Sequence, residues 1–174
     1  MRIDSHQHFW KYNPVKDAWI TENMKVIQRD FLPSDLHPLL NENKIDGCVA
    51  IQADQSEDET HFLLQLADSN DFIKGVVGWV DLRGENLESS LGYFSQFKKL
   101  KGFRHIVQGE KDDNFLLRYD FCNGIAQLEK YNFTYDLLIF PKHLAVALEF
   151  VKKFPNQKMA VSYTHLTLPT NREV

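Results

Sequence analysis

The sequence predicts an α/β fold built on a parallel sheet, because short apolar segments of strand length alternate with amphipathic segments at helical spacing. We expect six strands, at residues 1–6, 46–52, 72–81, 100–108, 134–140 and 158–161. The interiors of the second and third are nearly continuous hydrophobes and do not alternate with polar residues. That pattern is typical of strands covered on both faces, as in parallel sheets.

Between the strands the apolar residues recur with the period of a helix. Ser56 followed by Glu59 predicts a capping box at the start of one helix, and Pro33 opens another. Four apolar stripes follow: Phe62, Leu63, Leu66 and Ala67; Leu87, Leu91 and Phe94; Phe121, Ile125 and Leu128; and Leu144, Leu148 and Val151. Strand–helix–strand units of this kind connect with right-handed crossovers.

The length limits the architecture. Residues 1–161 hold five strand–helix units and the start of a sixth strand, whereas a complete eight-unit barrel takes about 250 residues. The chain is therefore either a small open sheet or a TIM-type (β/α)₈ barrel that is truncated. Residues 162–174 leave the strand–helix rhythm, and Pro169 would interrupt either element. We interpret them as an anomalous tail that is not native to the fold.

Composition excludes several classes of protein. The chain is 43% hydrophobic and 25% charged with a net charge of −4, which is ordinary for a globular protein and gives no basic footprint for nucleic acid. It has no apolar stretch of the roughly 20 residues that a membrane span needs, and no apolar leader. Its two cysteines suggest neither a disulfide framework nor a zinc motif. We expect a cytoplasmic protein without nucleic-acid or membrane partners.

The sharpest chemical signal is His6-Gln7-His8 at the end of the first strand. Side chains two positions apart on a strand point to the same side, so both imidazoles can face the mouth of a barrel, where barrel active sites lie. Such a pair can ligate a divalent metal or stabilise charge on a carbonyl oxygen. The alternative is two ordinary polar residues, but their place on the first strand favours the site and the truncated barrel. Three other histidines fall in helical stretches and are read as surface or packing residues: His37, His61 and His143.

Further candidates stand at later strand ends. Arg104 and His105 close the fourth strand, where a guanidinium can bind a substrate carboxylate through two hydrogen bonds. The competing interpretation of Arg104 is a structural ion pair. Gln52 ends the second strand and is a candidate for binding a sugar hydroxyl.

Trp79 and Asp81, on one face of the predicted third strand, complete the substrate-binding candidates, although Asp81 can instead cap the next helix. Asp136 lies early in the fifth strand, where a buried carboxylate needs a partner, so a structural role is expected. Three aromatic residues after the first strand either wall the pocket or belong to the core: Phe9, Trp10 and Trp19.

Together with the first ten residues, segments 29–33, 75–82, 102–108 and 134–137 resemble the amidohydrolase-related proteins. Within these, the chain is most similar to the branch of L-fuconolactonase-like and 2-pyrone-4,6-dicarboxylate lactonase-like enzymes, over residues 1–161. The resemblance implies a TIM-type barrel that hydrolyses a cyclic ester of a sugar acid. Some members of the superfamily need a divalent metal, while lactonases of this branch can work without one. No cofactor is therefore certain, and any bound metal, with zinc as the expected ion, would be held by His6 and His8.

The resemblance also shows what is missing. His6 and His8 match the family's first-strand pair, but the Asp-His pair expected after the sixth strand would fall at Ser162 and Tyr163. His165 lies in the anomalous tail and is not taken as its replacement. The aspartate that activates water after the eighth strand has no counterpart.

The main hypothesis is a lactone hydrolase that opens a sugar-acid or related organic-acid lactone by attack of water on the ring carbonyl. One alternative keeps the barrel but makes the reaction a metal-dependent amide hydrolysis or decarboxylation. Another is a catalytically inactive barrel fragment, whose open edges would make it aggregate or associate with a complementing piece. The substrate is expected to be a small molecule, and the sequence does not predict the oligomeric state.

Overall fold

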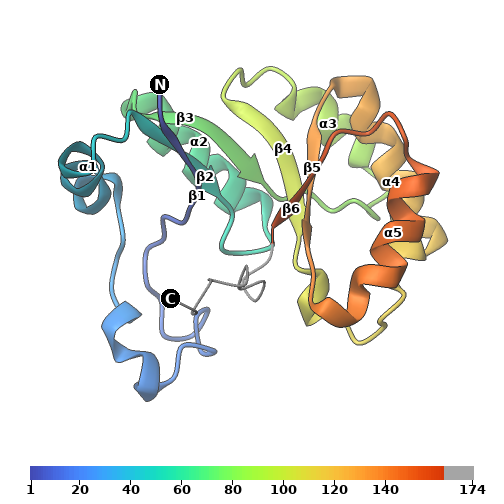
Figure 1. Cartoon of the computed structure of the whole chain (residues 1–174), viewed down its shortest axis with the longest axis horizontal. Coiled ribbons are helices and arrows are strands. Elements are labelled where there is room, and N and C mark those ends of the chain that lie inside the picture. Colours follow the sequence, from blue (N-terminus) through green and yellow to red (C-terminus); the bar gives the residue numbers. More distant parts are fainter. Residues whose placement is uncertain (163–174) are drawn as a thin grey trace, which may run out of the picture.

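Six parallel strands form one sheet in the computed structural model, which describes residues 1–162 (Figure 1). Their order in the sheet is their order in the chain, from β1 to β6, and every neighbouring pair is parallel. The strands are β1 (Ile3–Gln7), β2 (Gly47–Ile51), β3 (Ile73–Gly78), β4 (Leu100–His105), β5 (Thr134–Leu138) and β6 (Met159–Ser162). The prediction of five strand–helix units and a sixth strand is confirmed.

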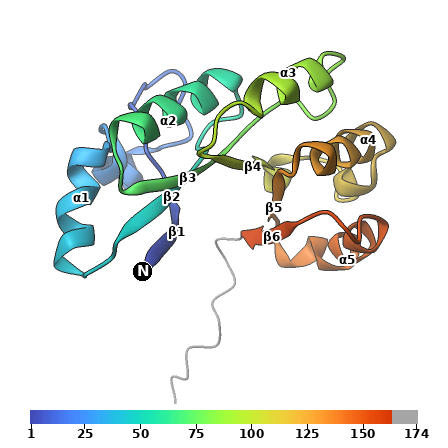
Figure 2. The same cartoon turned by 90° about the horizontal axis from the view of Figure 1, so that it is seen from above.

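Five helices connect the strands: α1 (Pro33–Glu42), α2 (Glu57–Ser69), α3 (Leu87–Phe94), α4 (Tyr119–Leu128) and α5 (Leu144–Lys153). Viewed from above, the sheet is curled and the helices follow its outer, convex side (Figure 2). This is the arrangement of part of a (β/α)₈ barrel, with helices outside and strands inside. No helix within residues 1–162 is long and apolar enough to cross a bilayer.

β3 and β4 each end three residues earlier than predicted. β3 stops at Gly78 because the chain turns after it, where the Gly84 amide donates to the Asp81 carbonyl at 3.0 Å. β4 stops at His105, and the next residues form a 3₁₀ turn at Val107–Gly109. Apolar residues continue past both strand ends in the sequence, and that continuation caused the overestimate.

The core fills the space between the sheet and the helices. Tyr135 projects from β5 and meets Phe121 of α4 and Phe150 of α5, and Phe103 of β4 belongs to the same buried cluster. The Phe121 and Tyr135 rings lie 5.8 Å apart, and the Tyr135 and Phe150 rings 6.0 Å apart, both edge to face. Aromatic pairs with this geometry stabilise a core beyond the area that they bury.

The predicted apolar face of α5 is wrong. Leu144, Leu148 and Val151 are 50%, 58% and 39% exposed, whereas Ala147 and Phe150 are buried. The helix carries more hydrophobic residues than one face can bury, and the large Phe150 ring decides which face meets the sheet. Spacing alone could not choose between the two faces.

The predicted N-terminus of α2 is correct, but its capping box is only half formed. Ser56 Oγ accepts a hydrogen bond from the Glu59 amide at 3.2 Å, which is the capping bond. The Glu59 carboxylate does not return to Ser56. It accepts instead from the Ala53 amide at 3.1 Å and is buried at the carboxyl end of the sheet.

Candidate active site

His6 and His8 converge as their spacing predicted. Their Nε2 atoms lie 3.0 Å apart, and the two rings stand nearly perpendicular at 77°. Both side chains are partly buried, so the rings are neither sealed in the core nor turned to opposite sides. The pair lies where β1 ends, at the edge of the sheet at which barrel active sites form.

The tautomer of His8 is set by the neighbouring strand. Its Nδ1 lies 2.9 Å from the Ile51 carbonyl oxygen, which can only accept, so Nδ1 carries the proton. Burial, reinforced by the Arg104 guanidinium and by His6, lowers the pKa of His8 to about 4. A neutral His8 therefore keeps a lone pair on Nε2, directed at His6. Burial and Arg104 also lower the pKa of His6.

Arg104 brings a buried positive charge to this pair. Its Nη1 lies 3.5 Å from His6 Nε2, and its Nη2 donates to the Gln52 carbonyl oxygen. Gln52 is fully buried and returns a bond, because its Nε2 donates to the Arg104 carbonyl at 3.2 Å. Burial lowers the pKa of Arg104 to about 10, so the group is still cationic near neutral pH. Within residues 1–162, its buried Nε has no hydrogen-bond partner.

Asp136 is the charge partner of Arg104. The two residues are opposite one another in the parallel register of β4 and β5 and hence on one face of the sheet. Burial raises the pKa of Asp136 to about 6, and the Arg104 charge opposes that rise. Arg104 thus attracts this buried carboxylate from the same face of the sheet.

A cavity of about 830 Å³ opens beside these groups, and both His8 and Arg104 line it. Its walls come from three places in the sequence. The β1–α1 segment supplies Trp10 and Trp19, the start of α2 supplies Glu59 and Phe62, and the residues after β4 supply Ile106 and Gln108. Phe9 instead belongs to the core at 1% exposure. Burial raises the pKa of Glu59, a residue that sequence analysis treated only as part of a helix cap.

The remaining candidates lie elsewhere. His105 sits 2.7 Å from Glu110, accepts from Trp79 Nε1 at 3.4 Å and stacks on Phe115 at 4.8 Å. Both of its nitrogens are therefore engaged, and burial lowers the pKa of His105. Asp81 is exposed beyond the end of β3, where its carboxylate accepts from the Arg83 amide at 3.0 Å. These contacts join Trp79 to His105 and leave Trp79, Asp81 and His105 out of the cavity lining.

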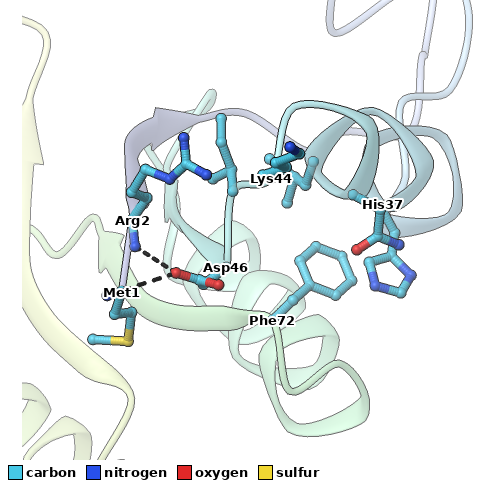
Figure 3. A pocket seen from close by; sticks show the side chains of 9 residues that line it. Met1, Arg2, His37, Lys44, Asp46 and Phe72 are labelled. Atoms are coloured by element: carbon cyan, nitrogen blue, oxygen red, sulfur yellow. Dashed lines mark hydrogen bonds and ion pairs between the residues drawn. The ribbon is translucent and has the colours of Figure 1, made fainter.

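A second hollow, of about 420 Å³, lies at the amino ends of the strands (Figure 3). Asp46 holds the amino terminus there at 3.8 Å and accepts from the Arg2 amide at 2.5 Å. His37 stacks on Phe72 at its rim with ring centroids 4.6 Å apart, as expected for a packing histidine. The convergent histidines and the buried arginine all lie at the opposite end of the sheet.

The described residues supply only part of a metal site. A catalytic zinc takes three protein ligands, and two imidazoles with converging Nε2 atoms provide two of them. No group of three His, Cys, Asp or Glu side chains within residues 1–162 is placed to hold a metal. The guanidinium of Arg104 stands at the third side of the pair and brings a charge that opposes a cation. Of the two positions expected for the Asp-His pair, Ser162 is described and Tyr163 lies outside the described residues, as does His165.

Comparison with known proteins settles the family. The profile of a family described as amidohydrolase matches residues 3–170. The chain belongs to the amidohydrolase family. Among curated amidohydrolase relatives, L-fucono-1,5-lactonase of Burkholderia multivorans is 43% identical over 145 residues, which are 83% of this chain and 49% of that protein. L-fucono-1,5-lactonase of Burkholderia ambifaria is 30% identical over 93% of this chain and 56% of that protein. The chain thus spans about half the length of these relatives.

Solved amidohydrolase structures agree with the fold. A crystal structure of a Burkholderia multivorans amidohydrolase with bound zinc superposes with a TM-score of 0.88 at 39% identity, over 92% of this chain and 57% of that one. A probable 2-pyrone-4,6-dicarboxylic acid hydrolase from Acinetobacter baumannii gives 0.67 at 14% identity, over 93% of this chain and 57% of that one. The second likeness concerns the fold alone. Six strands of an amidohydrolase barrel are therefore present in this chain.

Proposed function

We propose that the protein opens sugar-acid lactones by adding water to the ring carbonyl. The observation that carries the proposal is the cluster of His6, His8 and Arg104 at the carboxyl end of the sheet, beside a cavity of about 830 Å³. The relationship to two L-fucono-1,5-lactonases supports a lactone as the substrate class. A cavity of this size accommodates a single sugar ring.

Arg104 and the histidine pair have different roles in this proposal. Arg104 places a buried cation beside His6, where it would stabilise negative charge on the carbonyl oxygen. His8, whose Nε2 lone pair is directed at His6, would hold His6 in place beside the ring carbonyl. The oxygen of water bonds to that carbon, and the tetrahedral oxyanion collapses with cleavage of the ring C–O bond. The proton that the attacking water loses balances the proton that the ring oxygen gains as it leaves as a hydroxyl, so the product is the open hydroxy acid. The general base that the family resemblance implies lies after an eighth strand, beyond the six strands described here.

The test is hydrolysis of a panel of aldono-1,5-lactones, with the rate measured as release of acid. We expect His6→Ala and His8→Ala to lower kcat by about 10² to 10⁴, the range typical of lost oxyanion or acid–base groups. His37→Ala, at the amino end of the sheet, is the matched control and should keep the rate. Equal rates in all three variants would show that the histidine pair has no role in the reaction.

A metal-dependent amide hydrolysis or decarboxylation is the second candidate, because the Burkholderia multivorans structure holds zinc. Metal analysis of the purified protein separates the two. Zinc bound one to one, with activity lost on chelation and regained on addition of zinc, would favour this candidate. Lactone hydrolysis that survives removal of the metal would favour the mechanism above.

A further inference from the structure

The outer wall of the cavity is a long segment between β1 and α1. It contributes Trp19, Ile20 and Ile27 to the lining and lies at the carboxyl end of the sheet (blue in Figure 1). Its two ends are joined by reciprocal backbone hydrogen bonds of 3.0 Å between Trp10 and Phe31. Connections of this length inside a compact domain are usually functional.

One side chain ties the middle of this segment to the opposite wall. Lys16 Nζ lies 3.0 Å from Asp54 Oδ2 and 3.8 Å from Glu59 Oε2. These two residues belong to the β2–α2 connection and to α2 itself. Across residues 1–162, the ion pairs that join residues 11–28 to the rest of the molecule are these two.

Both carboxylates are also held in place by contacts that do not involve Lys16. Asp54 accepts from Ser56 Oγ at 2.8 Å, and Glu59, only 6% exposed, accepts from the Ala53 amide. On the other side, the Lys16 amide donates to Asn13 Oδ1 at 3.1 Å, which fixes its turn. A solvated lysine paired with one mobile carboxylate stabilises little. Here two anchored carboxylates share the ammonium, and one of them is buried, so the contact restrains the segment.

We propose that Lys16 is a positioning residue that holds the Trp19-bearing wall against α2 and thereby sets the affinity for substrate. It acts on binding and not on bond cleavage, because the histidine pair and Arg104 are fixed independently by Ile51 and Gln52. The choice of a lactone as its ligand rests on the proposed function. The restraint of the segment by Lys16 does not.

Hydrogen–deuterium exchange of the intact chain tests the restraint. Lys16→Met keeps the length of the side chain and removes its charge, so amides of residues 11–28 should exchange faster, by about tenfold if the contact is worth about 1.4 kcal/mol. Lys16→Arg should restore slow exchange. Lys25→Met, an exposed lysine of the same segment, is the control and should match the wild type. Exchange in α4 reports whether each variant is folded.

Steady-state kinetics on an aldono-1,5-lactone then test the consequence. Lys16→Met should raise KM about tenfold with kcat within about twofold, and Lys16→Arg should recover the KM. Unchanged exchange in Lys16→Met, or a loss confined to kcat, would overturn the inference. If the wild type hydrolyses no lactone, the proposed function fails, and the exchange measurement still decides the role of Lys16.

Discussion

At the scale of single residues, the main feature of this site is the presence of opposite charges on Arg104 and Asp136. The sequence allows two interpretations of Arg104, a ligand for substrate or a member of a structural ion pair. The structure is compatible with both, because Arg104 is opposite Asp136 in the sheet register and also contacts His6. A buried carboxylate next to a buried guanidinium keeps the site close to neutral while leaving a donor for a ligand. The protonation of Asp136 is therefore linked to stability.

We predict that Asp136 makes the wild type less stable as the pH rises. Its pKa is about 6 in the folded chain and about 3.9 in an unfolded one, so between these values the folded state holds a proton that the unfolded state has lost. Asn cannot titrate. From pH 4 to pH 7 the free energy of unfolding of Asp136→Asn should therefore gain about 2 kcal/mol relative to the wild type. Urea unfolding of both proteins at several pH values measures it, and a difference that is constant with pH would contradict it.

At the scale of elements, helical periodicity predicted the buried face of α4 correctly but not that of α5. α4 buries the predicted stripe of Phe121, Ile125 and Leu128, whereas α5 buries Ala147 and Phe150 and exposes its predicted stripe. α4 is bordered by α3 and α5 along the curl of the sheet, while α5 follows it as the last helix described (Figure 2).

We predict that two apolar residues of α5 differ sharply in their contribution to stability. Phe150→Ala should lower the free energy of unfolding by about 3–5 kcal/mol, because it removes a fully buried ring that packs on Phe121 and Tyr135. Leu148→Ala should change it by less than about 0.5 kcal/mol, since the side chain is 58% exposed. Chemical denaturation of both variants measures the contrast. Equal losses would mean that Leu148 is covered in solution.

At the scale of the molecule, the six described strands form an open sheet. Within the described chain, β1 and β6 each pair with one neighbour only, and the chain spans about half the length of its lactonase relatives. Parallel strands with free edges offer unpaired N–H and C=O groups to another chain. The inactive, self-associating fragment considered from the sequence is therefore a state to be measured alongside catalysis.

We predict association that depends on concentration and runs through the β6 edge. Val161, 60% exposed on β6, is the residue to change, because a lysine on an edge strand discourages pairing. Val161→Lys should shift size-exclusion elution toward the monomer. Val26→Lys, 80% exposed in the β1–α1 segment, is the matched control and should elute like the wild type. Monomeric wild type at all concentrations would count against association.

The sequence by itself determined the parallel α/β order, the strand positions and the convergence of His6 and His8, because all of these follow from local periodicity. It also placed Gln52 and Arg104 at strand ends, where they meet. Only the tertiary structure decided that Trp79 donates a hydrogen bond to His105 and that Asp81 lies in the turn after β3. It also brought Lys16 and Glu59, from different segments, to the wall of one cavity. Those outcomes depend on contacts between residues distant in the chain, and the spacing of residues along one strand carries no information about them.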